Sequence, residues 1–101
     1  MPVSLSYQAD NATLAIDGKF TFDIHRTFRQ LTEQALNNPA CARLDMDLSS
    51  VEYLDSSALG MLLLAREKAS ALNKPIRIKG ARGHTLQILQ VVKFDSMFEL
   101  A

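Results

Sequence analysis

Three adjacent polar residues, Asp55, Ser56 and Ser57, are the side chains in this sequence best placed for chemistry. They stand at the start of the most apolar helical pattern in the chain. The first turn of a helix offers free backbone N–H groups and the positive end of the helix dipole, so it favours an anion. A serine there can be part of a cap, a phosphate acceptor or a nucleophile. From spacing alone, capping is the favoured interpretation, with a stabilisation of about 1 kcal/mol.

The elements that position these residues begin with two strand patterns. Residues 3–7 and 14–16 alternate apolar and polar side chains, and the turn signal Asp10-Asn11 separates them, with Gly18 closing the second. Two short alternating runs around a polar turn predict an opening β-hairpin.

Helical and strand patterns then alternate. Residues 24–36 carry an apolar stripe, with Asp23 placed to cap the start and Asn37-Asn38-Pro39 ending the helix. The second predicted helix spans residues 56–73, and a third, shorter one spans residues 85–92. The stripe expected to be buried on the second helix consists of Leu59, Leu62, Leu63, Arg66, Ala69 and Leu72.

Two further strands are predicted between these helices. Residues 44–48 alternate leucine or methionine with aspartate, and residues 76–78 form a strand that ends at Gly80. A last apolar segment, residues 94–100, is expected to form a short strand or turn. Strands that alternate with helices require crossover connections. We therefore expect an α/β fold, one domain over residues 1–101, with a mixed, mostly parallel β-sheet of four to five strands and about three α-helices.

Composition excludes several classes of function. Eleven basic residues balance eleven acidic ones, which argues against binding of nucleic acid or an anionic membrane. The N-terminus lacks a secretory signal, and the longest apolar run, residues 61–65, is far too short for a membrane span. A single cysteine, Cys41, excludes an internal disulfide. We expect a cytoplasmic protein with no metal, because Cys41, His25 and His84 show no ligand spacing, and with no cofactor.

The run of residues 48–60, LSSVEYLDSSALG, resembles the signature of the STAS family, and in particular of bacterial anti-sigma-factor antagonists. Residues 18–22 are similar to the glycine-led loop of that family, and residues 86–98 to its closing helix and apolar tail. Two positions depart from the family pattern: Ala58 replaces a glycine, and Thr21 replaces an acidic residue.

The resemblance implies a function as a phosphorylation-controlled binding switch. Ser56 matches the serine that is phosphorylated by an anti-sigma factor that is also a serine kinase, and Asp55 and Ser57 match residues that support it. Unphosphorylated protein would hold that kinase, phosphorylation would release it, and a serine phosphatase would reset the switch. The residues expected to face the partner are Phe20, Thr21, Phe22, Asp23, Ser56, Ser57 and Leu59.

Three alternatives are weighed against this interpretation. A serine hydrolase would need His25 or His84 as a base and a glycine-flanked elbow, which the residues around Ser56 do not form. An acyl carrier would be acidic and helical, whereas this chain is neutral and rich in strand patterns. A STAS-type structural or regulatory subunit of a lipid-transport or stress-signalling complex remains open.

Overall fold

The alternating segments at the N-terminus form a hairpin that begins a single five-stranded sheet. The computed structural model describes residues 2–101. Its elements are β1 (Val3–Gln8), β2 (Asn11–Phe20), the 3₁₀ turn η1 (Phe22–Ile24), α1 (His25–Asn37), β3 (Arg43–Leu54), α2 (Ser56–Ala71), β4 (Ile76–Lys79), α3 (Gly83–Val91), the 3₁₀ turn η2 (Phe94–Ser96) and β5 (Glu99–Leu100). The strands follow the order β1-β2-β3-β4-β5. The β1–β2 pair is antiparallel and the other pairs are parallel, which confirms the expected mixed, mostly parallel sheet.

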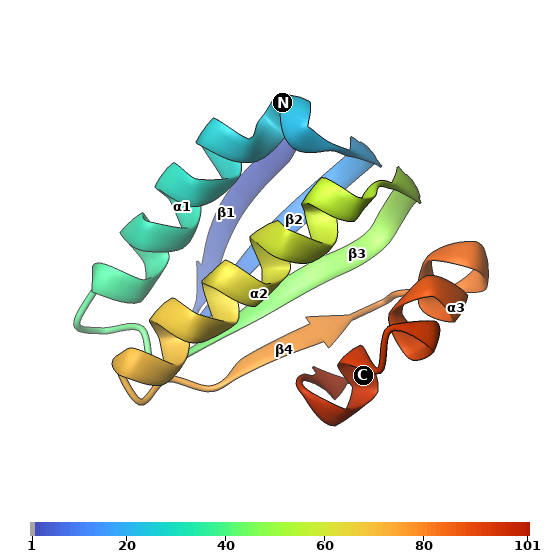
Figure 1. Cartoon of the computed structure of the whole chain (residues 1–101). Coiled ribbons are helices and arrows are strands. Elements are labelled where there is room, and N and C mark those ends of the chain that lie inside the picture. The colour runs from blue at the N-terminus through green and yellow to red at the C-terminus, as the bar shows by residue number, and fades with distance from the viewer. Residues whose placement is uncertain (1) are drawn as a thin grey trace.

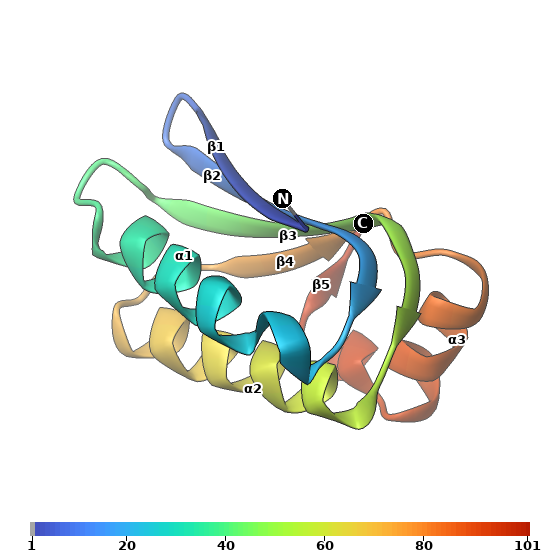
Figure 2. The same cartoon turned by 90° about the horizontal axis from the view of Figure 1, so that it is seen from above.

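All three α-helices lie against the same face of the sheet (Figures 1 and 2). Leu14, Met46 and Ile78 occupy one cross-strand row and are fully buried on that face. Asp45 and Arg77 are the neighbours of Met46 and Ile78 in sequence, so they point to the opposite face. The sheet therefore has one apolar face under the helices and one face that carries polar and charged residues.

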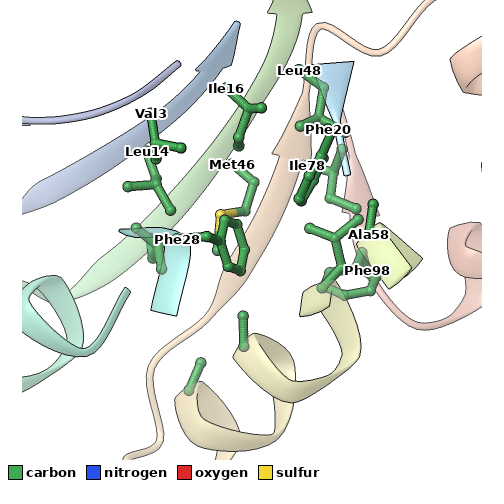
Figure 3. Packing of buried hydrophobic residues seen from close by; sticks show 14 of the residues in the cluster. Val3, Leu14, Ile16, Phe20, Phe28, Met46, Leu48, Ala58, Ile78 and Phe98 are labelled. Atoms are coloured by element: carbon green, nitrogen blue, oxygen red, sulfur yellow. The ribbon is translucent and has the colours of Figure 1, made fainter. Parts of the chain in front are cut away.

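The core fills the space between sheet and helices. Figure 3 shows Phe28 of α1 beside Met46 of β3, and Ala58 of α2 near Phe98 of the C-terminal segment. All four are buried, with exposed fractions of 4% or less. The apolar C-terminal tail predicted from the sequence thus completes the core, with η2 and the short β5 closing the sheet edge.

The structure corrects the expected lengths and faces of three elements. Strand β3 continues to Leu54 rather than stopping at residue 48, because β2 pairs with it as far as Phe20. Asp23 does not cap α1: it lies within η1, and Ile24 precedes the helix without a side-chain cap. On α2 the buried residues are Ala58, Leu62, Ala65 and Ala69. Leu63 and Arg66 on this helix and Leu72 directly after it are exposed.

Gly80 follows β4 at a position that only glycine fits. Its φ is +76°, and an added Cβ would lie 2.7 Å from the Cβ of Ser49. We expect Gly80→Ala to lower the free energy of unfolding by at least about 2 kcal/mol, from left-handed strain plus this clash.

The matched control for Gly80 is Gly60, which lies in α2 with open space around its Cα. Gly60→Ala is expected to be neutral or to stabilise the protein by up to about 1 kcal/mol, because alanine favours helix. Urea unfolding of both variants checks the difference, and equal stabilities would contradict it.

Candidate functional site

Helix α2 begins with a side-chain cap supplied by Asp55. Asp55 is in extended conformation, with φ −106° and ψ 179°, and its Oδ1 accepts a hydrogen bond from the Ala58 N–H at 3.0 Å. The capping interpretation is therefore correct for Asp55. The side chain of Ser56 is exposed at the first position of the helix, and Ser57 beside it is half-buried. Because Asp55 serves as the cap, the Ser56 hydroxyl is presented to solvent.

The loop that follows β2 lies directly against this helix start. The Asp55 N–H donates a hydrogen bond to the Phe20 carbonyl at 3.2 Å, and Phe20 pairs with Leu54 across the two strands. Parallel strands end at the same edge of the sheet, so segments more than thirty residues apart meet there (Figure 2). The tertiary structure thus brings the glycine-led loop to the Asp-Ser-Ser motif.

Most of the residues expected to face a partner are accessible at this edge. Phe22, Asp23 and Ser56 are exposed, and Thr21, Ser57 and Leu59 are half-buried. Phe22 is 57% exposed, which is unusual for a phenylalanine and marks it as a candidate contact residue. We call Thr21–Asp23 together with Ser56, Ser57 and Leu59 the switch surface.

Phe20 is the exception, and its assignment to a partner-facing surface is wrong for its side chain. Phe20 is 0% exposed, and its ring lies 5.3 Å from the ring of Phe28, centroid to centroid. Strand β2 continues through residue 20, so the pleat directs Phe20 to the helix-covered face. Its contribution to the site is the backbone carbonyl that receives the Asp55 N–H.

Two residues near the switch surface were not predicted from the sequence to face a partner. Tyr53, two residues before Asp55 on β3, is 51% exposed. The His25 ring stacks on Phe22 with centroids 4.0 Å apart, and its Nδ1 lies 2.8 Å from the Phe22 carbonyl oxygen. The spacing of three between Phe22 and His25 was the available signal for this stack.

The histidines do not form a catalytic pair with Ser56 in the described part of the chain. His25 uses its Nδ1 on the Phe22 carbonyl, and no hydrogen bond joins Ser56 to either histidine within residues 2–101. Over the same residues, no group of three or more His, Cys, Asp and Glu side chains is arranged to hold a metal ion. No helix in that range combines the length and apolar character needed to cross a membrane.

Removing the cap should destabilise the protein while removing the exposed hydroxyl should not. We expect Asp55→Ala to lower the free energy of unfolding by about 1 kcal/mol, since the Ala58 N–H loses its side-chain acceptor and keeps only the Asp55 backbone carbonyl at 3.1 Å. Ser56→Ala should change it by less than about 0.5 kcal/mol, because the Ser56 side chain is exposed. Chemical denaturation of the two variants provides the measurement. A larger loss in Ser56→Ala than in Asp55→Ala would contradict the assignment of the cap.

Comparison with known proteins decides the family. A family model described as "Mlab, STAS domain" matches residues 3–99. The chain belongs to the STAS-domain family. A STAS-domain containing protein of Pseudomonas aeruginosa is 35% identical to it over 96 residues, covering 95% of this chain and 93% of the relative.

Solved STAS-like structures share the fold at much lower identity. The anti-sigma factor antagonist SpoIIAA in its unphosphorylated form superposes with a TM-score of 0.72 at 13% identity, over 87% of this chain and 81% of that one. The phosphorylated form of SpoIIAA from Bacillus gives 0.76 at 13% identity, over 98% and 90%. A sulfate transporter family protein of Wolinella succinogenes gives 0.77 at 12% identity, over 91% and 74%. At these identities the likeness establishes the fold.

Proposed function

We propose that this STAS domain is an anti-sigma-factor antagonist whose binding to an anti-sigma factor is controlled by phosphorylation of Ser56. The unphosphorylated domain holds an anti-sigma factor that is also a serine kinase. That kinase phosphorylates Ser56, the modified domain dissociates, and a serine phosphatase resets it. In this cycle the domain is ligand and substrate, acts in the cytoplasm, and catalyses nothing itself.

The observation that carries this proposal is the exposed hydroxyl of Ser56 on a helix start whose cap is already supplied. Because Asp55 caps Ala58, modification of Ser56 would break no hydrogen bond of the fold. The neighbouring Phe22 is exposed and suited to burial against a protein partner. An accessible acceptor beside an apolar contact residue is what a kinase that is also the binding partner requires.

The release of the partner on phosphorylation follows from the negative charge that the phosphate adds to Ser56. A phosphate adds about −1.5 to −2 charges and three acceptor oxygens. The free N–H groups and dipole of α2 accommodate that charge within the domain. A partner surface shaped for a neutral hydroxyl would have to strip the water from this phosphate, which also stands next to the carboxylate of Asp55. Phosphorylation therefore favours dissociation over unfolding.

Affinity capture followed by a phosphorylation assay tests the proposal. Wild-type protein should capture an anti-sigma factor from an extract of its own cells, and the purified pair with ATP should place one phosphate on the domain. Intact-mass measurement should find that phosphate on wild type and not on Ser56→Ala. Equal phosphorylation of Ser56→Ala, or a captured partner that transfers no phosphate, would reject this site and this cycle.

A second function within the same fold has its own support. The family model carries the description of an Mlab STAS domain, and a sulfate transporter family protein shares the fold. These favour a role as a regulatory subunit of a transport complex, including lipid transport, or of a stress-signalling assembly. The same capture experiment separates the two, because it would then recover a transporter component whose binding is insensitive to ATP.

A further inference from the structure

His25 contacts both the ring and the backbone of the exposed Phe22. The two rings are stacked, with their centroids 4.0 Å apart and their planes inclined by 10°. The His25 Nδ1 lies 2.8 Å from the Phe22 carbonyl oxygen, and the His25 backbone N–H donates a hydrogen bond to the same oxygen. A carbonyl oxygen only accepts, so Nδ1 is the ring nitrogen that carries the proton. Side chain and backbone of one residue thus hold the turn that carries Phe22.

An apolar groove opens beside this pair of rings. It lies between α1 and α2, which run side by side in the same direction over one face of the sheet (Figures 1 and 2). Its lining includes Phe22 and His25 near the start of α1, and Met61, Leu64 and Ala65 along α2. The groove has a volume of about 160 Å³. A closed cavity of about 150 Å³ holds one benzene molecule, so the groove has room for one phenyl ring.

Phe22 is exposed although an apolar groove of sufficient size for its ring lies beside it. Moving an apolar ring out of water into an apolar groove is favourable, so an unrestrained Phe22 ring would turn inward. The stack on His25 opposes this movement, because neighbouring aromatic rings attract each other. The hydrogen bond from Nδ1 to the Phe22 carbonyl oxygen also fixes the backbone that carries the ring. His25 is therefore placed to keep Phe22 out of the groove.

We propose that His25 is a positioning residue that holds Phe22 on the switch surface, ready for contact with the anti-sigma factor. Without the His25 ring, Phe22 turns into the groove between α1 and α2, and the partner loses an apolar contact close to Ser56. An aromatic side chain that is fixed before binding contributes more to affinity, because binding then immobilises fewer groups. This inference rests on the function proposed for Ser56, and it identifies the residue that prepares the contact surface.

NMR of the free domain tests the position of Phe22 without any partner. Nuclear Overhauser effects from the Phe22 ring to the methyl groups of Met61 and Ala65, which line the groove, should be stronger in His25→Ala than in wild type. His25→Phe keeps a ring for stacking and should give the wild-type intensities. Unchanged intensities in His25→Ala would overturn the proposal, because the Phe22 ring would then stay outside the groove without His25.

Titration calorimetry with the purified partner then measures the effect on binding. His25→Ala should weaken the complex about tenfold, and Phe22→Ala should weaken it by at least as much. The double variant should bind no worse than Phe22→Ala alone, because His25 acts through Phe22. His25→Phe should bind within about threefold of wild type, since the stack is kept. Gln30→Ala, at an exposed position further along α1, is the matched control and should bind as wild type does.

The positioning role and the function proposed for Ser56 fail in different ways. A partner that is released by Ser56 phosphorylation but binds His25→Ala as tightly as wild type would overturn the positioning role alone. Additive losses in the double variant would also overturn it, because they would show that His25 contacts the partner directly. A partner whose binding ignores Ser56 phosphorylation would reject the function proposed for Ser56, and the role assigned to His25 would fall with it.

Discussion

Phosphorylation of Ser56 is expected to weaken the proposed complex with an anti-sigma factor by at least about 100-fold, equivalent to about 2.7 kcal/mol. The hydroxyl is exposed at the start of α2, so a partner that covers the switch surface must cover Ser56 as well. A dianion buried there loses its hydration and stands beside the Asp55 carboxylate. Like charges brought together at an interface cost several kcal/mol. This repulsion exceeds the stabilisation that the free N–H groups of α2 give to the phosphate.

Titration calorimetry with the purified partner measures this effect. Ser56→Asp should reproduce part of the loss, because one negative charge replaces nearly two. Ser56→Ala should bind within a few-fold of wild type, since it keeps the surface small and neutral. Ser70→Asp places the same charge on an exposed position near the far end of α2 and serves as the matched control. Comparable weakening by Ser70→Asp and Ser56→Asp would show that the effect is not local, and the switch would be refuted.

Replacing Asp45 by asparagine is expected to lower the free energy of unfolding by about 2 kcal/mol near neutral pH. Asp45 is 1% exposed on the sheet face that no helix covers. Its Oδ1 accepts a hydrogen bond from Arg77 Nε at 3.1 Å. Its Oδ2 accepts hydrogen bonds from Arg77 Nη2 at 2.8 Å and from Asn11 Nδ2 at 3.0 Å. An amide cannot accept at both positions, so at least one of these half-buried donors would lose its partner.

The effect of Asp45→Asn should depend on pH in a defined direction. Burial by itself raises the pKa of Asp45, but the hydrogen bonds from Arg77 and Asn11 and the charges of Arg77 and Lys79 outweigh it, so the pKa lies below its usual value. Because its pKa is lower in the folded state, the ionised Asp45 carboxylate stabilises the fold, and this stabilisation is complete at pH values above the unfolded-state pKa of about 3.9. That contribution is lost as the pH falls through the lower folded-state value.

Urea unfolding at neutral pH, near pH 5 and near pH 3 checks this dependence. The difference between wild type and Asp45→Asn should be equal at the two higher values and smaller at the lowest. Asp10→Asn, at an exposed turn position, is the control and should stay within about 0.5 kcal/mol throughout. A difference for Asp45→Asn that grows on acidification would show that the ionised carboxylate does not stabilise the fold.

The element order was predictable from the sequence because it depends on local signals. Alternation around Asp10-Asn11 predicted the hairpin, and Asn37-Asn38-Pro39 marked where the first helix ends. Strand–helix alternation then led to a mostly parallel sheet. The motif around Ser56 predicted a candidate site at a helix start, and the structure confirms that a helix begins at Ser56.

Periodicity could not identify the buried face of α2. Leucines occupy positions 62, 63 and 64 in succession, so apolar residues surround the helix and no single stripe stands out. Packing against the sheet and α1 selected the small residues Ala58, Ala65 and Ala69 together with Leu62. That choice left Leu63 and Leu64 exposed.

By itself the sequence determined which segments are strands and helices, and that a serine follows a capping aspartate at the start of α2, since propensity, capping and turn signals act over a few residues. The tertiary structure alone decided that Phe20 is buried, that Asp45 lies beneath Arg77, and that the Phe22 loop meets Ser56. Those outcomes depend on strand order and register, which join residues about thirty positions apart. No local pattern encodes such a pairing.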